Sequence, residues 1–118
     1  MQPVSRKDVN RLIKFLDDLV HSSPKQSLEL ELSKVANLLN RIGFQGPTSK
    51  SGPVRGFSHD LLKDDPMLSD GQITVHILHG RKVELITYRD FKRYVLPHVE
   101  EVLRELDEKK MIQEDPNE

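Results

Sequence analysis

A histidine behind a glycine-bearing loop is the residue of this chain most suited to chemistry. His59 is the last residue but one of the stretch SGPVRGFSHD (51–60), and two basic residues, Lys50 and Arg55, lie close to it in the sequence. An imidazole titrates at about pH 6.5, so it can take up and return a proton at physiological pH. Cleavage of a phosphodiester by a ribose 2′-hydroxyl needs such a group, together with positive charge and backbone amides that hold the phosphate. The stretch therefore predicts a phosphate-binding loop in which His59 acts as base or acid.

A purely structural interpretation of the same loop stands beside the catalytic one. Gly52, Pro53 and Gly56 are residue types that shape turns, and His59 would then be an exposed polar residue of the following strand. The residue pattern does not choose between these interpretations, because a catalytic group is recognised by its geometry and not by its neighbours in the sequence.

The other histidines give a weaker pattern. His76 and His79 are three residues apart, and a regular strand alternates its side chains, so it does not direct both rings to one face. No Asp or Glu completes a ligand set with them, so the sequence predicts no metal site and no other cofactor. His79 ends a strand and could approach His59 across the sheet. We assign no role to His21 or His98.

A second group of basic residues surrounds the expected start of the last helix. Helix N-termini and basic side chains both attract phosphate. The alternative is a solvated helix face that Glu84 and Asp90 partly neutralise. The basic residues of this group are Arg81, Lys82, Arg89, Lys92 and Arg93.

Length and composition set the class of protein. The chain has 118 residues, which is enough for one hydrophobic core. It has no cysteine, which excludes a disulfide framework, a zinc ribbon and a thiol nucleophile, and suits a reducing compartment. We find no apolar run of the roughly 20 residues that span a bilayer, and the N-terminus is polar. The sequence therefore predicts a cytoplasmic protein without a membrane partner.

The charge is unevenly distributed along the chain. The formal net charge is −1. Residues 34–63 nevertheless carry five basic side chains against Asp60 alone. This segment could favour a polyanion locally. Because the whole chain lacks a strong basic excess, any contact with nucleic acid would be confined to one face.

The apolar pattern predicts helices at both ends and strands between them. Helical spacing starts after Ser5 as N-cap, is broken at 21–25, and resumes from Ser27 or Ser33 to Gly43, the residue that ends that helix. Residues 57–62 and 72–79 read as strands, and GRKVELI (80–86) as a return strand or a lead-in to the next helix.

The last helix has the clearest start. Thr87 is its expected N-cap, and Pro97 predicts a kink or break near Leu96. The fold class that follows is α+β, a small antiparallel sheet of three or four strands packed by helices. The predicted divisions of the chain are an N-terminal helical extension (1–26), an α+β domain (27–112) and a disordered tail (113–118).

Four stretches together resemble the HicA toxin family, whose members are related to the double-stranded-RNA-binding fold. They are LSKVANLLNRIGF (32–44), VRGFSHD (54–60), ITVHILHGRKVE (73–84) and TYRDFKRYVL (87–96). The resemblance implies metal-independent cleavage of messenger RNA and a HicB-type antitoxin as partner. It gives His59 the catalytic role, with Gly56 and Ser58 as its motif companions.

Two main functional hypotheses follow, beside a third in which the histidines make the protein a small-molecule- or metal-binding regulator. The first is an RNA-binding protein or HicA-like endoribonuclease with His59 as acid or base. Its contacts with the RNA would come from Lys50, Arg55, Gly56, Ser58, His79 and Arg81. The second is a non-catalytic protein-interaction module that docks on a partner or forms a homodimer through its N-terminal helix.

Overall fold

Helices and short antiparallel sheets alternate along the chain, in an α+β arrangement. The computed structural model describes residues 1–21, 28–80 and 82–114. In chain order the elements are β1 (Val4–Ser5), α1 (Arg6–His21), β2 (Glu29–Glu31), α2 (Leu32–Arg41), β3 (Gln45–Ser49), β4 (Val54–Ser58), the 3-10 turn η1 (Asp60–Leu62), β5 (Gln72–His76), β6 (Leu78–His79), β7 (Glu84–Thr87), α3 (Tyr88–Asp90), the π-helical segment η2 (Phe91–Val95), α4 (Leu96–Glu108) and β8 (Ile112–Gln113).

The strands form two antiparallel sheets and one small parallel pair. The central sheet has the order β3-β4-β5, and the second sheet has the order β2-β7-β6. Val4 of β1 pairs with Ile112 of β8 in a parallel bridge, so both ends of the described chain meet. In the central sheet Phe57 stands opposite Ile73, so the two side chains lie on the same face of the sheet, and both are buried in the core.

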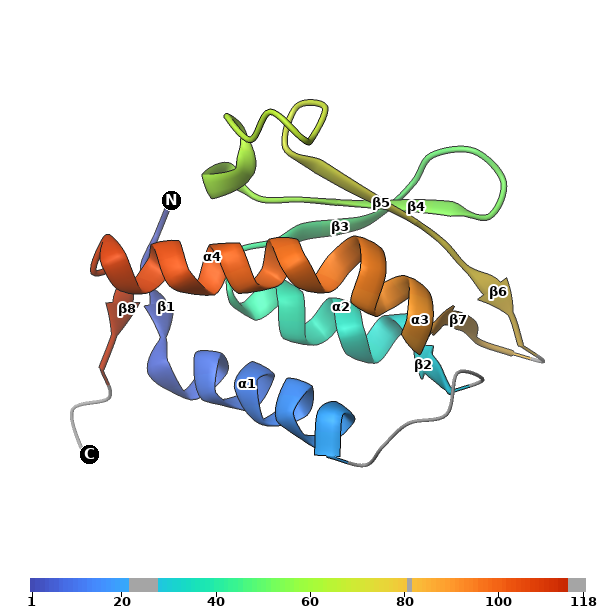
Figure 1. The fold of residues 1–118 in the computed structure, drawn as a ribbon, viewed down its shortest axis with the longest axis horizontal. Helices are drawn as coiled ribbons and strands as arrows, with labels where there is room; N and C mark the ends of the chain where they lie inside the picture. Colours follow the sequence, from blue (N-terminus) through green and yellow to red (C-terminus); the bar gives the residue numbers. More distant parts are fainter. Residues whose placement is uncertain (22–27, 81, 115–118) are drawn as a thin grey trace.

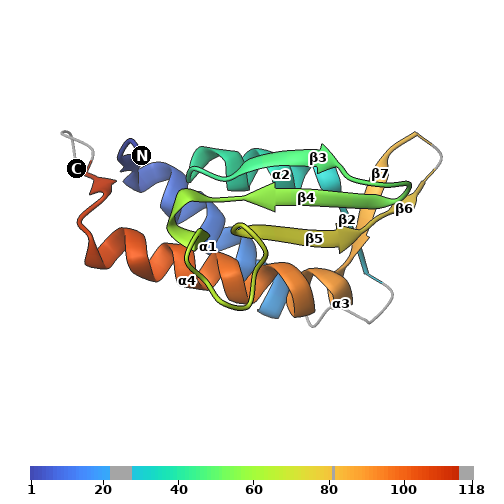
Figure 2. The same ribbon diagram turned by 90° about the horizontal axis from the view of Figure 1, so that it is seen from above.

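The molecule is layered. The central sheet covers α2 and α4, and α1 lies on the far side of these two helices (Figure 1). Seen from above, α2 runs beneath β3, and α4 runs along the β5 side (Figure 2). The buried core lies between the layers, and α1 contributes Val9 and Leu12 to it. Its other fully buried members include Leu39, Ile42, Phe57, Leu62, Ile73, Ile86, Phe91 and Leu106.

Local signals at the helix ends behave as expected. The Thr87 hydroxyl accepts a hydrogen bond from the Asp90 N–H at 3.1 Å, which confirms it as an N-cap. Ser5 Oγ accepts one from the Lys7 N–H at 3.1 Å at the start of α1. Gly43 follows α2 with φ of 102°, a conformation that a residue without Cβ adopts readily.

The helix departs from regular α-helical geometry just before Leu96, the position where a kink or break is predicted, but it continues without a gap. The helix that starts with α3 continues through the π-helical segment η2 into α4, which begins at Leu96. Pro97 therefore stands in the first turn of α4, where its missing N–H leaves no hydrogen bond unmade. The π-helical segment before Leu96 therefore accommodates the proline within the helix.

Three predicted boundaries are wrong. The strand expected at 57–62 begins earlier, at Val54, and ends at Ser58, because η1 follows. The strand expected at 72–79 is divided between β5 and β6, which belong to different sheets. The tail expected to be irregular from Gln113 pairs there with β1, and Glu114 binds Arg6 at 2.8 Å. Residues 115–118 lie outside the described part of the chain. Among the described helices, none has the length and apolar character that crossing a membrane requires.

Candidate functional site

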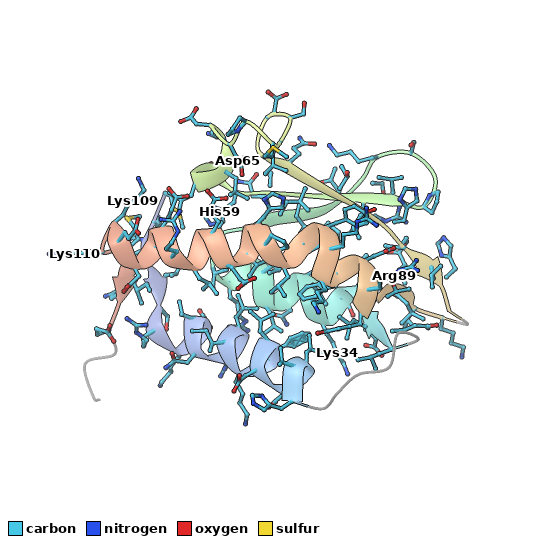
Figure 3. The ribbon with its side chains drawn as sticks, in the orientation of Figure 1. Lys34, His59, Asp65, Arg89, Lys109 and Lys110 are labelled. Carbon is cyan, nitrogen blue, oxygen red and sulfur yellow. The ribbon has the colours of Figure 1, made fainter. Side chains whose placement is uncertain are left out.

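His59 lies inside the protein, which corrects the expectation of a solvent-exposed imidazole. Its exposed fraction is 3%, and it is the one polar residue in the core among the described residues. The physical reason is local: β4 ends at Ser58 and the chain turns into η1, so the His59 ring enters the space beside the end of α2. Figure 3 labels it between the central sheet and α4.

Both ring nitrogens of His59 are engaged by the backbone. Nδ1 accepts a hydrogen bond from the Leu61 N–H at 3.1 Å. Nε2 lies 2.9 Å from the Ile42 carbonyl oxygen, and it must carry the proton because that carbonyl can only accept. Phe44 packs edge-on against the ring, with centroids 4.8 Å apart. The imidazole thus links the end of α2 to η1, and neither nitrogen is left for a substrate proton.

The approach of His59 to α2 also requires the glycine at position 43. A Cβ built there would lie 2.8 Å from His59 Nε2, closer than side-chain contacts allow. Gly43 and Phe44, which follow α2, therefore pack directly against His59, which follows β4.

The environment of His59 favours its neutral form. Burial is the largest influence and lowers the pKa, while the Ile42 carbonyl and the charge of Asp60 oppose that effect in part. A general base that works in water needs a pKa near the working pH and access to its substrate. His59 meets neither requirement, because its pKa is lowered and its ring is buried.

We expect the free energy of unfolding to decrease as the pH falls below about 6.5, the pKa of histidine in an unfolded chain. The folded protein has the lower pKa. Below pH 6.5 the unfolded chain therefore binds a proton that the folded chain does not, and this difference favours unfolding. Urea unfolding of the protein and of His59→Gln at several pH values between 8 and 5 measures it. The decrease should be smaller in the variant, and parallel profiles would contradict the assignment.

The residues predicted to hold a phosphate do not converge on His59. Arg55, near the other end of β4, forms an ion pair with Glu84 and donates to the Gly52 carbonyl at 2.8 Å. Arg55 and His59 are four positions apart along extended backbone, which corresponds to about 13 Å. The aliphatic stem of Lys50 lies over Gly56, where a Cβ would meet its Cε at 2.7 Å. Arg55 and Lys50 thus make contacts within and beside the central sheet, and these contacts do not involve His59.

The remaining predicted contacts are dispersed. His79 is exposed on β6, opposite Glu84 of β7. Figure 1 shows β6 at the end of the molecule away from η1, so His79 does not approach His59, and that expectation is wrong. Ser58 is half-buried at the end of β4. Arg81 lies outside the described residues.

A different surface has the features of a binding site. The sequence pointed to the N-terminal helix as an interaction surface, but not to the second helix that forms the other wall. Two adjoining depressions, of about 440 and 350 Å³, run between α1 and α2 and share Arg11, Phe15 and Leu38. We call their combined lining the α1–α2 groove. Its residues are Arg11, Lys14, Phe15, Asp18 and Leu19 of α1, and Lys34, Asn37, Leu38 and Arg41 of α2.

The α1–α2 groove has an apolar floor and a basic rim. Phe15, Leu19 and Leu38 form the floor, and each is partly exposed. Phe15 packs edge-on against Phe91 with centroids 6.3 Å apart, which fixes the floor to the core. The charged lining residues are four basic and one acidic, and Lys34, labelled in Figure 3, belongs to the rim. Two of the four cations have an acidic neighbour outside the lining: Arg41 is 3.5 Å from Asp8, and Lys34 is 3.9 Å from Glu31.

The sequence held one signal for this groove. The apolar positions of α1 include Phe15 and Leu19 beside the buried stripe of Val9 and Leu12, so the apolar face is wider than one packing partner covers. The sequence left two interpretations of this stripe open, a core-facing surface or a docking and dimerisation surface of the N-terminal helix, and it gave no signal for the wall that α2 contributes.

A larger hollow of about 780 Å³ lies on the other side of α2. It shares Asn37 and Arg41 with the α1–α2 groove. Its opposite wall comes from Pro47 of β3 and from the link between β6 and β7. Its charged lining residues are Arg41, Lys82 and Glu84, so the hollow has no single sign of charge.

The chain was also compared with known proteins. Neither protein-family models, nor curated proteins, nor solved structures give a match.

Proposed function

We propose that this protein is a non-catalytic interaction module that binds an acidic, amphipathic segment of a partner protein in the α1–α2 groove. The observation that carries the proposal is the combination of a partly exposed apolar floor with a rim of four basic residues and one acidic residue. A partner helix with apolar residues on one face and carboxylates beside them satisfies both features at once.

The apolar floor favours a protein over RNA. Single-stranded nucleic acid is held by cations together with exposed aromatic rings on which bases stack. Of the aromatic residues in the described part of the chain, Tyr94 alone is exposed, and it does not line the groove. Phe15 is packed against Phe91 and offers an apolar surface more than a stacking platform.

The state of His59 speaks against catalysis as the main role. A HicA-like ribonuclease needs an accessible acid–base histidine, and here the imidazole is buried with both nitrogens engaged. The resemblance to the HicA family still names one partner to test, a HicB-type protein. In this proposal such a partner binds to the groove and does not need to cover a catalytic residue.

We expect a synthetic acidic peptide to bind the groove. The probe is a fluorescent 14-residue peptide with Leu at helical i, i+3, i+4 and i+7 positions and Glu elsewhere. Fluorescence anisotropy should give saturable binding that weakens with salt. Lys34→Glu and Arg11→Glu should each reduce the affinity about tenfold or more, because each replaces an attraction by a repulsion.

Three controls accompany this measurement. Lys92→Glu changes an exposed lysine outside the groove and should leave the affinity unchanged. A peptide of the same pattern with Lys in place of Glu should not bind. A 12-nucleotide single-stranded RNA is the third probe: if the RNA binds, the acidic peptide does not, and Lys34→Glu weakens only RNA binding, the protein-interaction proposal is wrong.

A further inference from the structure

One imidazole and two carboxylates meet between the loop that follows η1 and the first half of α4. They belong to Asp65, His98 and Glu101, and Figure 3 shows Asp65 over this part of α4. One ligand atom from each residue lies within 4.8 Å of the other two. His98 Nδ1 and Asp65 Oδ2 are 3.7 Å apart. The cluster is separate from the α1–α2 groove and shares no residue with it.

The spacing of these atoms is close to what a metal ion needs. With metal–ligand bonds of about 2.0–2.2 Å in tetrahedral geometry, neighbouring ligand atoms are about 3.3–3.5 Å apart. The Nδ1–Oδ2 distance is already near this value. Glu101 is the longest of the three side chains and lies on a helix, so rotation about its own torsions brings its carboxylate in.

The backbone holds two of the ligands from rigid elements. His98 and Glu101 are three residues apart on α4, which places both on one side of the helix. Asp65 comes from 33 positions earlier, and its Oδ1 accepts a hydrogen bond from the Met67 N–H at 2.8 Å. That bond leaves Oδ2 facing the imidazole, the kind of outer support that orients metal ligands. The side chains of Asp65 and His98 are only 12% and 20% exposed.

We propose that Asp65, His98 and Glu101 bind a divalent transition-metal ion through one nitrogen and two oxygen ligands. The donor set is the borderline kind that Zn²⁺ accepts, and the Irving–Williams order places Zn²⁺ above Mn²⁺ and Co²⁺ at such a site. Water completes the coordination. The ion would tie the loop after η1 to α4, which gives the site a structural role.

The electrostatic surroundings agree with a cation. Asp65 and Glu101 line a depression of about 320 Å³ together with Asp60, Asp64, Glu105 and Lys109, and His98 lies outside this lining. The Arg104 guanidinium is 3.9 Å from the Glu101 carboxylate, so the metal would compete with this ion pair. Asp65 and Glu101 each offer a carboxylate oxygen, and these two atoms lie within 4.8 Å of each other. Two carboxylates at this separation repel each other, and a divalent cation between them removes the repulsion.

Metal titration of the full chain tests the site. The protein is first dialysed against EDTA and then titrated with ZnCl₂ by calorimetry, with Co²⁺ as a second probe followed by its visible absorption. The expected result is one ion per chain and a higher melting temperature with Zn²⁺. His98→Ala and Asp65→Asn should each weaken Zn²⁺ binding at least tenfold and abolish the rise in melting temperature.

Glu101→Gln separates loss of binding from loss of folding. It removes one of two repelling carboxylates, so its melting temperature without metal should equal or exceed that of the original protein, while Zn²⁺ binding weakens. Glu100→Gln and His76→Ala change exposed residues outside the cluster and should bind Zn²⁺ normally. No saturable binding to the original protein, binding that survives in His98→Ala and Asp65→Asn, or binding that disappears in His76→Ala would each overturn the proposal.

Discussion

The His59→Ala variant is expected to lose about 3–5 kcal/mol of unfolding free energy. The substitution removes a buried ring that packs against Phe44, and large-to-small changes in a core cost about 2–5 kcal/mol. It also leaves the Ile42 carbonyl and the Leu61 N–H without their partner, and each unsatisfied buried group costs about 1–3 kcal/mol. Water that enters the cavity would recover part of this loss, so the two contributions do not add in full.

Urea unfolding followed by circular dichroism measures this loss. His76→Ala is the matched control, because it removes an exposed histidine of β5 and should change the free energy of unfolding by no more than about 0.5 kcal/mol. If His59→Ala were as stable as the original protein and only the original degraded RNA, His59 would be a catalytic residue and its structural role would be refuted. Activity of both proteins, or of neither, removes the catalytic hypothesis.

Gly46→Ala is expected to destabilise the central sheet by about 2–4 kcal/mol, through backbone strain and overpacking. Gly46 has φ of 124°, a conformation that residues with a Cβ rarely adopt. A Cβ at this position would lie 2.5 Å from the Gly56 carbonyl oxygen and 3.1 Å from Phe57. The first of these neighbours is backbone of β4, so the strand itself would have to move.

Gly52→Ala provides the comparison for this variant. Gly52 also has positive φ, 53°, but a Cβ there meets nothing within 4 Å. Its cost should therefore be that of a left-handed alanine alone, about 1–2 kcal/mol. The two variants measured side by side in urea separate strain from collision. Equal losses of unfolding free energy in the two variants would show that the Gly56 carbonyl does not restrict the side chain at position 46.

Features that depend on neighbours in the sequence were predictable from the sequence. Thr87 caps a helix because its hydroxyl reaches an amide three residues ahead. Gly43 ends α2 because it tolerates positive φ, and Pro97 marks the start of α4 because proline lacks an N–H. These are effects of one turn of backbone, and the α+β class follows from the periods of the apolar residues between them.

Features that depend on distant segments were not predictable in this way. The divided strand at 72–79 is an example. Apolar and polar residues alternate over most of the segment, but β5 pairs with β4 and β6 pairs with β7. Arg55 was expected to bind phosphate and instead meets Glu84, which is 29 residues away. A single chain shows which residues are charged, and only the fold shows which of them neutralise one another.

The sequence by itself determined the caps at Ser5, Gly43 and Thr87 and the class of the fold, because these depend on short-range sterics and hydrogen bonds. The tertiary structure alone decided where side chains point and what they meet. It turned His59 inward, opened the groove between α1 and α2, and brought Asp65 to His98 and Glu101. The residue types in these places allowed several kinds of chemistry, and the packing of distant elements selected among them.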